Sequence, residues 1–223
     1  MFRELLSLWR QEDLLKQAFE TAGQMLVVTR EMYDEVIRCT LQGTQSQFDV
    51  HQRDKDLNVM EKEIRRKILE HLSINPQQDV ASSLVLASVV NDIERIGDYA
   101  KNVEELMELA PVGLDSLKQS QELKSSSERI LGFFDLTREA FLAGDKDKAS
   151  IVMKEHREVR KVCDNAIRGA LESGSVDKAG AVVMVLFSRY LKRTSAHLKN
   201  IASSVVQPFD DIGYTKPPKI SDE

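Results

Sequence analysis

The chain has 223 residues, 42% of them hydrophobic, and a formal net charge of −5. The negative charge argues against nucleic acid as the main partner, because DNA-binding proteins neutralise phosphates with a basic surface. The length allows either one large hydrophobic core or two smaller ones. Only 10 Gly and 5 Pro interrupt the sequence, which therefore favours long helices over strands.

The first ten residues form a short amphipathic segment. Arg3 and Glu4 interrupt its apolar run, so it lacks the long apolar stretch of a signal peptide. No stretch of the chain approaches the roughly 18 apolar residues of a membrane span. Four apolar residues fall on one helical face of this segment: Phe2, Leu5, Leu6 and Trp9. We expect this face either to dock on a partner or membrane surface, or to cover the protein's own core.

Apolar residues three and four positions apart predict three helices in the first half of the chain. The first covers residues 14–41. The second ends near Leu72, because the residue before Pro76 is biased away from helix. The third covers about 78–109 and stops at Pro111.

The second half repeats this pattern, with helices predicted over residues 114–143, from there to about 173, and over 176–206. The breaks in the two halves correspond in order: Gly43, Pro76 and Pro111, then Gly144, Gly174 and Pro208. An internal duplication accounts for this correspondence, and long helices joined by short turns must lie antiparallel.

We therefore predict an all-α fold made of two tandem antiparallel three-helix bundles. The first bundle, with the N-terminal segment, covers residues 1–112 and the second covers 113–207. Residues 208–223 are rich in Pro, Lys and Asp and are expected to form a flexible tail.

The third predicted helix contains the sequence NDIERIGDYAKN at residues 91–102. This stretch resembles the PhoU family, whose third helix carries an ERIGD-type signature. The preceding helix, with DKDLNVMEKEI at 54–64, is similar to the family's D-x-x-V-N-x-L-E-x-E-I pattern. The second half matches more faintly, through RYLKR at 189–193 and NIA at 200–202. The resemblance covers residues 14–206.

The resemblance implies a cytoplasmic regulator, without catalytic activity, of phosphate uptake and phosphate-responsive signalling. Members of the family usually self-associate, so a homodimer is expected, with phosphate transporter components or a sensor kinase as partners. The alternative is a cytosolic helical module beside a sodium–phosphate or other ion transporter, acting as a scaffold without metal. Both readings share one fold, so they differ in partner and not in shape.

The resemblance also implies a site for iron or another divalent metal in the first bundle. Glu94 and Asp98 stand one helical turn apart and could share a hard cation, with Asp54 and Asn58 supplying the facing helix. The alternative is a set of ordinary ion pairs, since Arg95 and Lys101 each lie three residues from Asp98. These two readings stay open on the sequence alone.

The comparable positions of the second half carry His156 and Arg160 on one helix and Lys192 and Ala196 on the next. Acidic ligands are missing there, so we predict no metal cluster. Arg160 and Lys192, with the adjacent Arg193, could instead meet an anion or an acidic partner. Lone histidines on helices, such as His156 and His197, are expected at the surface.

The sequence does not favour an enzyme. A di-iron carboxylate enzyme needs paired Glu-x-x-His motifs, and none of the four histidines has a Glu three residues before it. Cys39 and Cys163 are isolated and lack CxxC spacing, which favours reduced thiols. Regulation would instead use an exposed helix face with a few aromatic anchors, and Phe2, Trp9 and Tyr214 are the predicted contacts.

Overall fold

The computed structural model describes residues 2–111, 120–172 and 177–214, with the side chains of residues 2–13 left out. The described part of the chain is helical and contains no strand, which confirms the all-α prediction. Its elements are α1 (Phe2–Gln42), α2 (Val50–Ile74), α3 (Val80–Leu109), α5 (Gln121–Ala143), α6 (Lys146–Glu172), α7 (Lys178–Val206) and the short 3-10 helix η2 (Phe209–Asp211).

Side-chain caps fix where several helices begin. Asp49 accepts a hydrogen bond from the backbone N–H of Gln52 at the start of α2, and Asp177 accepts one from Gly180 at the start of α7. Such caps satisfy N–H groups that have no partner inside the helix. Helix α5 ends at Gly144, whose φ of 67° is a left-handed conformation that glycine adopts without strain.

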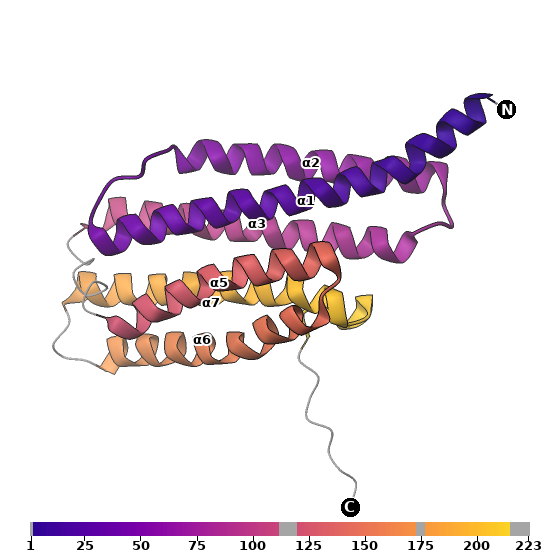
Figure 1. The fold of residues 1–223 in the computed structure, drawn as a ribbon. Coiled ribbons are helices and arrows are strands. Elements are labelled where there is room, and N and C mark those ends of the chain that lie inside the picture. The colour runs from indigo at the N-terminus through magenta and orange to yellow at the C-terminus, as the bar shows by residue number, and fades with distance from the viewer. Residues whose placement is uncertain (1, 112–119, 173–176, 215–223) are drawn as a thin grey trace, which may run out of the picture.

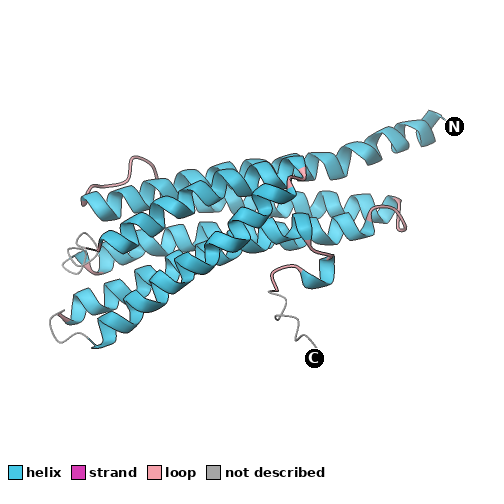
Figure 2. Ribbon diagram, turned by 60° about the horizontal axis from the view of Figure 1, so that its bottom comes forward, coloured by secondary structure: helices cyan, strands magenta, loops and turns pink. Residues whose placement is uncertain are grey.

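Helices α1, α2 and α3 pack on one another as a first bundle, and α5, α6 and α7 form a second. Figures 1 and 2 show the two bundles side by side, with α3 against α7 and α1 against α5. One hydrophobic core continues from bundle to bundle. Tyr33 of α1 illustrates this continuity, because its ring lies 5.3 Å from that of Phe134 on α5 and its hydroxyl donates to the carbonyl of Ser127.

Helices α2 and α3 approach closely at Gly97, in the middle of the signature sequence. A Cβ atom added there would lie 2.6 Å from Cδ1 of Leu57, whose side chain is buried. The absence of a side chain at Gly97 therefore sets the spacing of these two helices. This spacing brings the polar residues of α2 within reach of those of α3.

Two terminal segments differ from a simple pair of bundles. Helix α1 continues through residues 2–13 and projects beyond its neighbours (Figure 1), but the side chains of Phe2 and Trp9 lie outside the described part. At the other end, residues 209–214, the described start of the predicted tail 208–223, fold back on the second bundle, since Gly213 donates its N–H to the hydroxyl of Ser203. Residues 215–223 of that prediction lie outside the described part. The predicted boundary between the bundles lies in residues 112–119, outside the described ranges.

Candidate functional site

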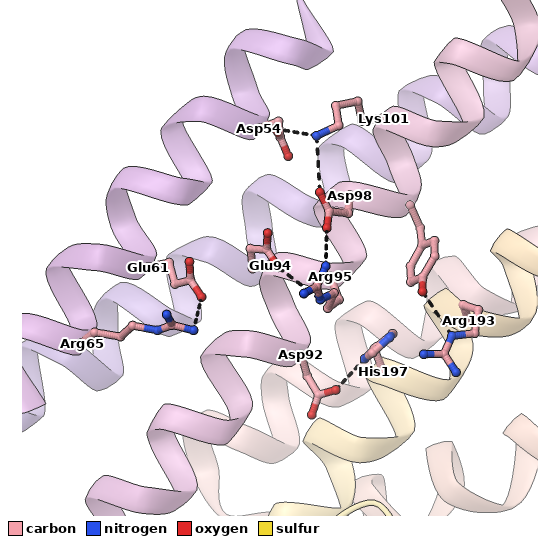
Figure 3. Close-up of polar contacts among 11 residues, drawn as sticks. Asp54, Glu61, Arg65, Asp92, Glu94, Arg95, Asp98, Lys101, Arg193 and His197 are labelled. Carbon is pink, nitrogen blue, oxygen red and sulfur yellow. Dashed lines mark hydrogen bonds and ion pairs between the residues drawn. The ribbon is translucent and has the colours of Figure 1, made fainter.

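The signature residues of α3 point in two directions (Figure 3). Glu94 and Asp98 lie toward α2, whereas Asp92 lies toward α7. Two residues are separated by about 200° around a helix, so Asp92 and Glu94 must face nearly opposite sides. Helix α3 therefore takes part in two distinct polar contacts.

The contact toward α2 is centred on Lys101. Its Nζ lies 2.9 Å from Oδ2 of Asp54 and 3.3 Å from Oδ1 of Asp98 (Figure 3). Nη1 of Arg95 bonds the other oxygen of Asp98 at 3.0 Å, and Nε of Arg95 lies 3.7 Å from Oε2 of Glu94. We call Asp54, Glu94, Arg95, Asp98 and Lys101 the Lys101 cluster.

Burial and charge perturb two groups of the Lys101 cluster. Burial raises the pKa of Glu94, and the negative charge of Asp98 raises it further. Burial alone would lower the pKa of Lys101, but its hydrogen bonds and charge interactions with Asp54 and Asp98 outweigh this effect and raise it. Lys101 is therefore held as a cation between two carboxylates.

The predicted metal ligands do not fit a metal cluster in this arrangement. The side-chain amide of Asn58 donates to the backbone carbonyl of Asp54, its own helix neighbour, at 3.0 Å. Among the described residues, no three His, Cys, Asp or Glu side chains are grouped so that they could hold one metal ion. The ammonium of Lys101 lies between the carboxylates that a metal would need. Iron or another divalent metal here stays a prediction that requires Lys101 to move.

The contact toward α7 joins the two bundles. Oδ1 of Asp92 lies 2.5 Å from Nδ1 of His197 and accepts a hydrogen bond from Nδ2 of Asn200 at 3.1 Å. The ring of Tyr99 stacks on His197, and its hydroxyl accepts from Nε of Arg193 at 3.2 Å. Because His197 is buried in this contact, the prediction that it lies at the surface is wrong.

Sequence reasoning missed this role of Asp92, although a signal was present. Asp92 and Glu94 are two positions apart, which places them on opposite sides of a helix, and the NIA sequence contains Asn200. More than 100 residues separate Asp92 from His197 and Asn200 in the chain. Only the packing of α3 on α7 shows that they meet.

The corresponding region of the second bundle is basic. Nζ of Lys192 on α7 lies 2.5 Å from Oδ1 of Asp164 on α6, and Nε of Arg160 lies 3.7 Å from its Oδ2. His156 is half-buried, not at the surface as predicted, and its Nδ1 lies 2.8 Å from Oγ of Ser195. Burial and four neighbouring cations lower the pKa of His156 to about 4.

Within the ranges that the structure covers, no helix combines the length and the apolar character required to cross a membrane.

The sequence matches the family model of the PhoU domain twice, over residues 22–107 and 123–205. The chain belongs to the PhoU family. The two matched stretches fall in different bundles, and together they contain the polar residues of both regions described above.

Known proteins share both sequence and fold with this PhoU-family chain. The phosphate-specific transport system accessory protein PhoU homolog 1 of Thermotoga maritima is 21% identical over 209 residues, covering 88% of this chain and 86% of that protein. The crystal structure of the phosphate transport system regulatory protein PhoU from Streptococcus pneumoniae superposes with a TM-score of 0.69 at 15% identity, over 89% of this chain and 94% of that one. The crystal structure of PhoU from Pseudomonas aeruginosa superposes with a TM-score of 0.65 at 20% identity, over 89% of this chain and 95% of that one.

Proposed function

We propose that this chain is a cytoplasmic regulator of phosphate uptake and phosphate-responsive signalling, and that it catalyses no reaction itself. The observation that carries the proposal is the match of both bundles to the PhoU domain. The names of the relatives, an accessory protein and a regulatory protein of phosphate transport, support the same role. The proposed partners are components of a phosphate transporter or a sensor kinase.

The described residues support action through protein contacts. The polar groups of α3 are engaged in holding α2 and α7, as the Lys101 cluster and the Asp92 contact show. They therefore serve the architecture of the protein. The long outer faces of the bundles and the projecting end of α1 (Figure 2) then remain for partners, including a second copy in the proposed homodimer.

Tyr214 is the one predicted anchor whose side chain is described. Its side chain is 71% exposed, while its backbone carbonyl accepts a hydrogen bond from Nε2 of Gln207. A fixed backbone with an exposed aromatic ring suits a contact residue, because little conformational freedom is lost on binding. Phe2 and Trp9 keep their predicted role as further anchors.

Deletion of the gene in the organism of origin tests the proposal. We expect higher phosphate uptake and higher expression of phosphate-starvation genes in phosphate-replete medium, with both restored by the wild-type chain on a plasmid. Measurements of radiolabelled phosphate uptake and of a starvation-promoter reporter would show this. Unchanged uptake and unchanged reporter activity in the deletion strain would refute the proposed function.

The alternative, a scaffold beside a sodium–phosphate or other ion transporter, rests on the same fold and differs in partner. Crosslinking of a tagged chain in intact cells, followed by mass spectrometry, separates the two. Recovery of phosphate transporter components or a sensor kinase supports the lead proposal. Recovery of a sodium-coupled transporter without any change in starvation-gene expression on deletion favours the alternative.

A further inference from the structure

A cavity of about 670 Å³ opens in the second bundle, between α6, α7 and the folded-back segment at residues 207–214. Its lining is strongly basic, and no Asp or Glu is among the described residues that line it. The basic lining residues are Lys154, His156, Arg157, Arg160, Lys161 and Lys199. We call this space the basic cavity.

The spacing of its residues on α6 explains the concentration of charge. Lys154, Arg157 and Lys161 are three and four positions apart, so they follow one another along a single face of the helix. Of the acidic residues between them, Glu155 pairs with Arg129 of α5 at 3.5 Å and so points its charge away from the cavity residues. Glu158 pairs with Lys161 at 2.9 Å and offsets the charge of that one lining residue.

Internal counter-ions do not balance the basic cavity. Arg160 lies 3.7 Å from Asp164, but that carboxylate also pairs with Lys192 at 2.5 Å. Within the described residues, neither Lys154 nor Arg157 has a carboxylate at ion-pair distance. Like charges on one helix face repel each other. Without enough counter-ions, they also make the electrostatic potential in the cavity positive.

Lys199 adds a buried cation to the wall of the basic cavity. Its residue is only 8% exposed, and its Nζ donates to the backbone carbonyl of Gly213. An ammonium has three N–H donors, and this neutral carbonyl accepts one of them. Burial lowers the pKa of Lys199, and the negative charge of Asp92 opposes this lowering only in part. An anion in the cavity would relieve this cost.

His156 lies in the wall of the basic cavity, and its pKa depends on the charges around it. Burial lowers this pKa most, and it is lowered further by Lys199 and Lys192 from α7 and by Arg157 and Arg160 from its own helix. Its Nδ1 is held by the hydroxyl of Ser195, which fixes the ring in the wall. A bound anion would offset these cations, so the pKa of His156 should rise when the cavity is filled.

We propose that the basic cavity binds a phosphoryl group, either as inorganic phosphate or on a phosphorylated small molecule. Arg and Lys donors suit the several oxygens and multiple charge of phosphate, and Arg can bond two of those oxygens at once. The volume lies within the range of small-molecule sites and admits a ligand of nucleotide size. Binding itself does not depend on the function proposed above. Its use as a signal of phosphate status does rest on that function.

Calorimetric titration of the full chain tests the site, with inorganic phosphate, pyrophosphate and ADP as probes at constant ionic strength. The variant Lys154→Gln combined with Arg157→Gln removes two exposed charges and should weaken binding at least tenfold. Arg168→Gln combined with Arg189→Gln removes the same charge from exposed positions outside the cavity and should leave binding unchanged. Comparison of the three probes shows whether free phosphate or a larger phosphorylated molecule is preferred.

The imidazole resonances of His156 provide a second readout. Saturating ligand should raise the pKa of His156 from about 4 toward its ordinary range, and the cavity variant should show no such ligand-dependent rise. Absence of saturable binding by every probe up to about 10 mM, or equal weakening in the two double variants, would overturn the proposal. Binding that is lost in the cavity variant, whose phosphate uptake is nevertheless normal, upholds the site and removes only its regulatory role. Normal regulation without any binding overturns the site and leaves the proposed function intact.

Discussion

The two bundles place opposite charges in equivalent positions between their second and third helices. In the first, Asp54 and Asp98 share Lys101 as an internal counter-ion. In the second, cations gather along α6 and α7, and Asp164 alone is shared between Lys192 and Arg160. The helix packing of this fold therefore does not dictate the charge of the region between these helices, because the polar residues there are not part of the shared hydrophobic core.

The largest expected effect concerns how closely the helices approach in each bundle. Gly97→Ala would place a Cβ atom 2.6 Å from the buried Leu57, and we expect a loss of about 1–3 kcal/mol in the free energy of unfolding. Gly169→Ala on α6 is the matched control, because a Cβ there meets nothing within 4 Å. Its higher helix propensity should add about 0.5–1 kcal/mol. Urea denaturation measures the free energy of unfolding of both variants. Equal changes at the two positions would contradict this view of the α2–α3 contact.

The next effect concerns the internal counter-ion of the first bundle. Lys101→Met keeps most of the side-chain volume but leaves Asp54 and Asp98 facing each other, which should cost about 1–2 kcal/mol of stability. Without the ammonium, these carboxylates with Glu94 become available to a divalent cation. We expect added Mn²⁺ to raise the melting temperature of the variant more than that of the wild type.

Elemental analysis of protein purified without chelators completes this test. If the wild type carried stoichiometric iron, manganese or zinc that Glu94→Gln with Asp98→Asn removed, the predicted metal site would be confirmed and Lys101 would have to leave the cluster on metal binding. If metal appeared only in Lys101→Met, the lysine would be the resident cation of the site.

The class of fold could be predicted from the sequence because helical periodicity and the positions of breaks are local properties. The pairing of Asp98 with Arg95 and Lys101 was also accessible as an alternative, since all three lie within two helical turns. The contact between Asp54 and Lys101 could not be predicted in this way, because 47 residues separate them and the register of α2 on α3 decides the contact.

The basic cavity shows a second limit of sequence reasoning. The charges of Arg160, Lys192 and Arg193 suggested an anion or an acidic partner, but the lining of the site also includes Gln207 and Tyr214, and composition alone assigned the chain from residue 208 onward to a flexible tail. A short 3-10 helix after Pro208 has little periodicity to detect. The buried state of Lys199 likewise follows from the fold of this segment.

A smaller effect tests the electrostatic cost of Glu94 in the Lys101 cluster. Its pKa is raised in the folded state, so the folded protein disfavours the ionised form and loses stability as the pH rises above the unfolded value near 4.5. Glu94→Gln should therefore stabilise the protein by about 0.5 kcal/mol at pH 7, with the difference from wild type vanishing below about pH 4.5. Glu70→Gln on the exposed face of α2 is the control and should show no such pH-dependent difference.

The smallest effect concerns the empty basic cavity. Lys154 and Arg157 repel each other along one face of α6 and lack carboxylate partners among the described residues, so Lys154→Gln with Arg157→Gln should stabilise the ligand-free protein by about 0.2–0.5 kcal/mol at low salt. Added chloride should reduce this gain by screening. Phosphate should reverse its sign, because a ligand that binds only the folded wild type stabilises it by mass action. A gain that was the same in phosphate and in chloride at equal ionic strength would show repulsion without a binding site. In that case the positive charge of the second bundle would lower its stability by repulsion and would not bind a ligand.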